Sequence, residues 1–205
     1  QGKDMKKRIT AFVMMAVICL TASAQFRWGP VASVNLSNYY FKQDLLKTGN
    51  VVGGGVGVMG ELMFTSVGIG IDMSLQWNMH GSKLHFDEYP VFAPTKTTTS
   101  YLHTLQLPIN IRYKYTRLNG FEEKLAPFVY GGPMFSVTVG HNKVEPLEYP
   151  GGCFGLQCGI GAEIYRHWQV SAGYVWGMTY ELRTRKLDNY SARCQYWQLK
   201  VAYLF

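Results

Sequence analysis

The chain has 205 residues, of which 47% are hydrophobic, and its formal charge is +7. Residues 1–24 contribute +3 of that charge, from four basic residues and one acidic residue, so residues 25–205 carry about +4 and contain no long basic run. After residue 24 no apolar stretch approaches the roughly 18 residues of a membrane-spanning helix, so a helical membrane protein and a basic nucleic-acid-binding protein are both excluded.

Residues 1–24 have the pattern of an N-terminal extension followed by a cleavable secretory signal peptide. Met5-Lys6-Lys7-Arg8 forms a positive region, and an apolar run of about a dozen residues follows it. Ala22-Ser23-Ala24 is a small-x-small cleavage site. The apolar run is too short to span a bilayer. We therefore predict that residues 25–205 form one exported domain.

Eight segments after residue 24 alternate apolar and polar residues with a period of two, which indicates strands with two different environments. The expected strands span residues 26–36, 52–62, 67–77, 101–115, 126–139, 152–164, 168–182 and 197–205. In the fifth strand Gly131-Gly132-Pro133 leaves the register open, because a bulge there would exchange the two faces.

The last strand is the most informative of the eight. One face carries only large apolar groups up to the final residue, and the other face is small or polar. The first set is Trp197, Leu199, Val201, Tyr203 and Phe205, and the second is Gln198, Lys200 and Ala202. A face of this kind is typical of a barrel strand that contacts lipid.

The connections alternate between short and long, as they do in bacterial outer-membrane barrels. Residues 63–66, 116–125 and 165–167 connect strands at one end, and the longer polar stretches 37–51, 78–100, 140–151 and 183–193 connect them at the other. We predict an all-β fold, an eight-stranded antiparallel up-and-down transmembrane β-barrel in a Gram-negative outer membrane. Both termini would lie on the periplasmic rim, within an aromatic girdle. The expected girdle is Trp28, Tyr113, Tyr115, Tyr165, Trp168, Tyr203 and Phe205.

Two strands carry a family resemblance. Residues 101–115 contain Leu105-x-x-Pro108-Ile109-x-Ile111-x-Tyr113-Lys114, and Pro127 to Pro133 read Pro-Phe-Val-Tyr-Gly-Gly-Pro. Both resemble strand motifs of the PorT-like outer-membrane β-barrel family. The resemblance implies an eight-stranded barrel in the outer membrane. It brings no catalytic residues, and it implies a link to export of surface proteins only for a few members.

The inward faces of the expected strands carry equal numbers of acids and bases. The predicted lumen charge network consists of Glu61, Asp72, Glu163 and Glu181 with Arg27, Arg112, Lys114 and Lys200. Gln76, Gln106, Gln157 and Gln198 add polar bulk. Eight strands leave an interior that side chains can fill, so we predict a plugged lumen, with a small pore as the alternative.

Other motifs predict no catalytic, cofactor or metal site. The stretch Gly55 to Gly60 matches the dinucleotide fingerprint, but it lies inside a strand with another strand after it. His80 and His85 are expected to be solvated loop residues. His103 faces outward without the serine of lipid-modifying outer-membrane enzymes, so that class is only an alternative.

Three cysteines follow residue 24. Cys153 and Cys158 point to opposite faces of one strand, so they cannot pair with each other, whereas Cys153 and Cys194 could meet near the loop end. Three small buried thiols are the favoured interpretation, since the count is odd.

The predicted role is structural or interactive, exercised through surface loops or within an envelope or secretion complex. The expected partners are outer-membrane lipid, the barrel assembly machinery and an envelope protein. We expect the longest loop, residues 78–100, to contact a partner through Phe86, Tyr89, Phe92 and the run Thr97-Thr98-Thr99.

Overall fold

Ten strands follow one another along the part of the chain that the structure describes. The computed structural model describes residues 24–41, 47–64, 68–85, 97–115, 123–141, 147–148, 151–179, 182–184 and 191–205. Eight strands are long: β1 (Ala24–Phe41), β2 (Lys47–Phe64), β3 (Ile69–His85), β4 (Thr97–Lys114), β5 (Leu125–His141), β7 (Gly152–Ile164), β8 (Trp168–Gly177) and β10 (Ser191–Tyr203). Two are short: β6 (Leu147–Glu148) and β9 (Leu182–Thr184).

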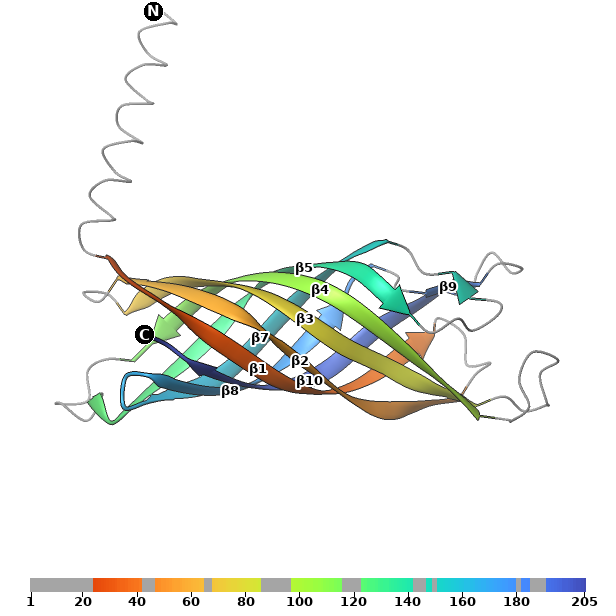
Figure 1. The fold of residues 1–205 in the computed structure, drawn as a ribbon, viewed down its shortest axis with the longest axis horizontal. Coiled ribbons are helices and arrows are strands. Elements are labelled where there is room, and N and C mark those ends of the chain that lie inside the picture. The colour runs from red at the N-terminus through yellow and green to blue at the C-terminus, as the bar shows by residue number, and fades with distance from the viewer. Residues whose placement is uncertain are drawn as a thin grey trace, which may run out of the picture.

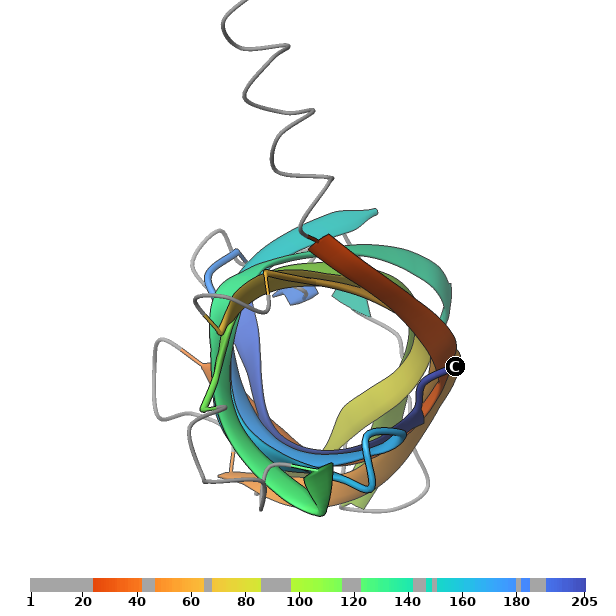
Figure 2. The same cartoon turned by 90° about the vertical axis from the view of Figure 1, so that its left-hand side faces the viewer.

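The eight long strands close into a single barrel. They pair in the order β1-β2-β3-β4-β5-β7-β8-β10, and β1 then pairs with β10, with Ala32 opposite Val201. Neighbours are antiparallel throughout, and the view along the barrel shows the closed ring (Figure 2). The predicted eight-stranded antiparallel up-and-down β-barrel is therefore confirmed.

The barrel has two different ends. One end, which we call the terminal rim, carries the start of β1 at Ala24, the final residue Phe205 and the turn Tyr165–His167 (Figure 1). The opposite end, the loop rim, carries the short strands β6 and β9, which extend the sheet beyond β10 (Figure 1). No sequence pattern predicts these two short strands, because each is only two or three residues long.

Side chains alternate between the wall and the lumen as the sequence predicts. On β10, Trp197, Leu199 and Val201 are exposed on the outside, while Gln198 and Ala202 are buried inside. The open question in β5 is also settled. The pairing of β5 with β7 runs without a shift through Gly131-Gly132-Pro133, and even-numbered residues are buried on both sides of it. The faces therefore do not exchange.

The strands extend further toward the loop rim than the sequence predicts. β3 continues to His85 and β4 begins at Thr97, so most of the expected loop 78–100 is a paired hairpin. The ladder pairs these polar residues through the backbone, which needs no apolar alternation. Only residues 86–96 of that stretch, with Phe86, Tyr89 and Phe92, lie outside the described residues.

Several sequence-based expectations fall on residues that the structure does not describe. The expected extension and signal peptide, residues 1–24, lie outside it except for Ala24, as does Glu181. All three cysteines after residue 24 are held as thiols. The expectation that all three are buried is wrong. Cys194 is buried, but Cys158 faces outward and is exposed. In the described residues no helix is long and apolar enough to cross a membrane.

Candidate functional site: the charged lumen

Glu61 is the centre of a charge cluster inside the barrel near the terminal rim. Its carboxylate accepts hydrogen bonds from Arg27 Nη2 at 2.8 Å, Arg112 Nη1 at 2.9 Å and Lys114 Nζ at 2.9 Å. Gln169 Nε2 donates a fourth bond to it. The Glu61 side chain is fully buried, so these donors replace the water that an ionised carboxylate requires.

Two further acids complete the cluster. Glu163 accepts bonds from Arg27 Nη2 at 2.6 Å and Lys114 Nζ at 2.7 Å, and Asp72 accepts one from Arg112 Nε at 2.9 Å. Three acids thus balance three bases, all within a region that excludes most water. Such a balance is what a stable buried ion cluster needs, because an unpaired buried charge is costly.

The β-ladder register places these residues. Arg27 lies opposite Glu61, Glu61 lies opposite Asp72, and Asp72 lies opposite Asn110, so neighbours on β1, β2, β3 and β4 form one row. Glu163 on β7 and Gln169 on β8 close the row across the lumen. The cluster therefore ties together opposite sides of the barrel wall.

Two residues of the predicted network are not in this cluster. Lys200 instead lies deeper in the lumen, with its Nζ over the ring of Tyr130, 4.6 Å from the centroid. Arg112 makes a similar contact with Phe128 at 4.2 Å. Glu181 lies outside the described residues. The predicted four-against-four set is therefore, among the described residues, a three-against-three cluster with a separate lysine.

Aromatic and amide side chains fill the lumen beyond the charges. Tyr130 reaches across to β7 and β8, where a Cβ on Gly159 or Gly173 would come within 2.6 Å of the Tyr130 ring or hydroxyl. Further toward the loop rim, Asn78 accepts bonds from Asn35 and Ser33 and donates to Gln106. The space beside Asp72, Tyr130 and Lys200 is only about 10 Å³, enough for at most one water molecule.

A larger pocket lies at the terminal rim. It measures about 580 Å³ and includes Arg27, Lys114 and Glu163 of the cluster in its lining. The other lining residues are mostly apolar groups and the turn residues Arg166 and His167. Because Arg27, Lys114 and Glu163 belong to both, this pocket is a vestibule that ends at the charge cluster.

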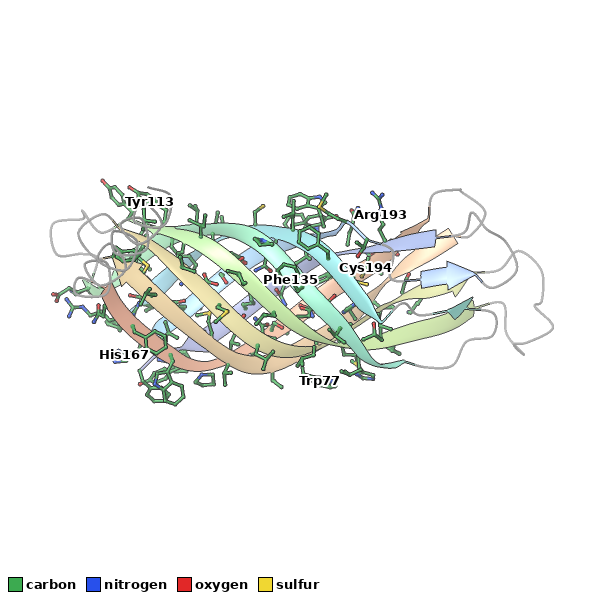
Figure 3. The ribbon with its side chains drawn as sticks, turned by 90° about the horizontal axis from the view of Figure 1, so that it is seen from above. Trp77, Tyr113, Phe135, His167, Arg193 and Cys194 are labelled. Atoms are coloured by element: carbon green, nitrogen blue, oxygen red, sulfur yellow. The ribbon has the colours of Figure 1, made fainter. Side chains whose placement is uncertain are left out.

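The residues of the predicted girdle all lie near the terminal rim. All but the half-buried Tyr203 are exposed. Four of them are joined by ring contacts: Trp28 with Phe205 at 5.5 Å, Phe205 with Tyr203 at 5.2 Å, and Tyr203 with Trp168 at 5.0 Å. Figure 3 shows Tyr113 and His167 at this end of the barrel, with Trp77 farther along the wall.

The structure shows a second aromatic belt that the sequence analysis missed. It contains Trp77, His103, Phe135, Phe154, Tyr174, Trp176 and Trp197, which form three groups with four ring contacts among them. On β8, Trp168 and Trp176 are eight residues apart. At a rise of about 3.3 Å per residue and a tilt of about 40°, the two belts are roughly 20 Å apart. That separation approaches the ~25 Å apolar band of outer-membrane barrels.

The glycine-rich stretch and the histidines that were weighed as nucleotide, metal or enzyme sites have packing roles in the barrel. Gly55 of the glycine-rich stretch lies in β2, where a Cβ would meet Asn78 Oδ1 at 1.9 Å, so glycine there makes room in the lumen. The expectation that His80 is a solvated loop residue is wrong. It is buried inside β3 and stacks on Tyr196 at 5.5 Å. His103 stacks on Trp77 at 5.3 Å. Among the described residues no group of three His, Cys, Asp or Glu side chains could hold a metal ion.

Sequence reasoning also missed Gln169, which bridges both glutamates and Arg112. A signal was available, since Gln169 stands between the outward residues Trp168 and Val170 and must therefore face inward.

Comparison with known proteins adds the context of the fold. Residues 10–205 match the family described as outer membrane protein beta-barrel domain. No curated protein sequence matches the chain. Among solved structures, OprG from Pseudomonas aeruginosa is 10% identical, with a TM-score of 0.52 over 89% of this chain and 96% of that one. Ail from Yersinia pestis (11% identical, TM-score 0.48, 88% and 99% covered) and Neisserial surface protein A (11%, 0.49, 89% and 99%) are also similar.

Proposed function

Because the chain belongs to the outer membrane protein beta-barrel domain family, we propose that it is a non-conducting outer-membrane barrel that acts through its rims. In this proposal residues 1–24 are removed on export, and the terminal rim faces the periplasm. The two aromatic belts then lie at the two membrane interfaces, where amphipathic rings are favoured.

The charge cluster is the observation that carries the proposal. A conducting pore needs a continuous hydrated path, whereas here six charged side chains neutralise one another across the lumen at 2.6–2.9 Å. The aromatic and amide groups beyond the cluster fill the remaining section. The interior therefore supports stiffness rather than transport, and recognition is left to the surfaces outside the membrane.

The length of the strands supports a role for the loop rim. Spanning a membrane takes about 9–11 residues of a tilted strand, whereas β1, β2 and β4 have 18. β3 continues for eight residues beyond Trp77 of the second belt. The sheet thus extends past the proposed membrane band and presents a rigid polar surface to a partner in the envelope or outside the cell.

Site-specific photo-crosslinking tests this proposal. A benzophenone amino acid would replace Lys83 at the loop rim, Tyr165 at the terminal rim or, as the wall control, Ile71; all three side chains are exposed. We expect discrete protein adducts, in intact cells, from at least one rim position and none from Ile71. Protein adducts from Ile71 alone would contradict a role exercised through the rims.

A further inference from the structure

The outer wall of the barrel carries an apolar groove next to the terminal rim. It measures about 560 Å³, within the roughly 300–1,000 Å³ range of ligand sites, and nearly all of its lining is apolar. Tyr113 on β4, Tyr115 just after β4 and Val170 on β8 line its two sides. Between them, β5 contributes the rigid Pro127 and β7 the small Ala162, which pair with each other in the ladder. Small residues between larger ones hollow the wall at this place.

Charged side chains continue this groove at the rim. The β5–β7 ladder pairs Pro127 with Ala162 and then Leu125 with Ile164. One step further, Tyr165 N donates to Lys124 O at 3.1 Å. The next step is the ion pair of Arg166 with Glu123 at 2.7 Å, both of whose side chains are about two-thirds exposed. The groove therefore ends, on its rim side, at two cations and one acid.

The turn that presents these cations is strained. Tyr165 and Arg166 have φ values of 50° and 62°, a region that bulky residues rarely adopt. A two-residue hairpin turn of this shape favours Asn-Gly. Large residues held in such a conformation are a known feature of ligand-binding sites. In this turn Tyr165 is 67% exposed and the side chain of Arg166 is about two-thirds exposed.

We propose that this groove binds one phospholipid, with an acyl chain along Pro127 and Ala162 and the phosphate at Lys124 and Arg166. An apolar groove that ends in exposed cations matches an amphiphile with an anionic group at one end. The exposed Arg166–Glu123 pair is weakly held, so Arg166 can turn to the phosphate. The placement in the inner leaflet follows from the proposed orientation of the terminal rim.

Native mass spectrometry of the full barrel in detergent tests the lipid site. The probe is palmitoyl-oleoyl-phosphatidylethanolamine, titrated into delipidated protein. Ala162→Trp fills the groove, and Ala32→Trp makes the same change at an exposed position on β1 outside it. We expect one lipid bound by the parent and by Ala32→Trp, and affinity at least about tenfold weaker in Ala162→Trp, or about 1.4 kcal/mol.

A second variant tests the headgroup contact. Lys124→Gln combined with Arg166→Gln should weaken binding severalfold while leaving the groove open. Equal lipid affinity in the parent and Ala162→Trp would overturn the proposal. A dimeric parent that becomes monomeric in Ala162→Trp would also overturn it, because the groove would then hold a second copy of the chain. Heat-modifiable mobility of each variant on gels checks that it folds, and conductance tests the plug separately, so the two proposals can fail independently.

Discussion

Replacing Glu61 with glutamine should destabilise the barrel more than any other single loss of charge in the lumen. Glu61 is fully buried and accepts bonds from Arg27, Arg112 and Lys114. The substitution keeps the size of the side chain but leaves three cations against the two remaining acids. One positive charge then lies uncompensated in a region with little water.

The structure sets the size of this effect. Removing one partner of a buried ion pair costs about 3–5 kcal/mol, a large part of the roughly 5–15 kcal/mol that stabilises a typical domain. The control is Glu123→Gln, which breaks the exposed pair with Arg166 and should cost roughly 0–1 kcal/mol. A rescue variant, Glu61→Gln with Lys114→Gln, restores charge balance and should recover part of the loss.

Urea unfolding in lipid vesicles, followed by tryptophan fluorescence, measures these free energies. We expect Glu61→Gln to unfold at clearly lower urea than the parent and the Glu123→Gln control, with the double variant between them. A free energy of unfolding for Glu61→Gln within about 1 kcal/mol of that of Glu123→Gln would refute the view that the cluster holds the barrel together.

Three further variants test the wall, the packed lumen and the turn. Val201→Arg places a charge on the outward face, which costs about 2–4 kcal/mol near mid-membrane. The level of this variant in the outer membrane should therefore fall well below that of Lys200→Ala. Equal levels of the two variants would reverse the assignment of faces. Gly55→Leu would drive a side chain into Asn78, so it should abolish heat-modifiable folding; normal folding would contradict the packed lumen. Tyr165→Asn should raise the free energy of unfolding by about 1 kcal/mol, because asparagine tolerates the positive φ better than tyrosine does. A loss of stability in this variant would show that the turn is not strained.

The sequence predicted the barrel because a wall between lipid and a polar interior imposes a strict period of two. Ile69, Ile71 and Met73 alternate with Gly70 and Asp72, and that pattern fixes which face is outside. The same constraint ends at the edge of the proposed membrane band. Beyond Trp77 the only large apolar residues of β3 are Met79 and Leu84, which do not alternate with a period of two, so the continuation of the strand to His85 left no pattern to detect.

The inward charges were predictable, but their partners were not. Register alone places Arg27 beside Glu61 and Glu61 beside Asp72, since they are neighbours in the ladder. Contacts across the lumen, such as Lys114 with Glu163, depend on side-chain length and barrel diameter, which no local pattern encodes. For the same reason Lys200 could not be assigned to the ring of Tyr130.

Conductance in planar bilayers tests the central claim, the plugged lumen, most directly. Purified barrel should insert without producing stable channels if, as we propose, the cluster around Glu61 and the side chains packed beyond it close the described part of the lumen to water. Reproducible single-channel steps whose ion selectivity reverses in Glu163→Lys would contradict the account and establish a pore.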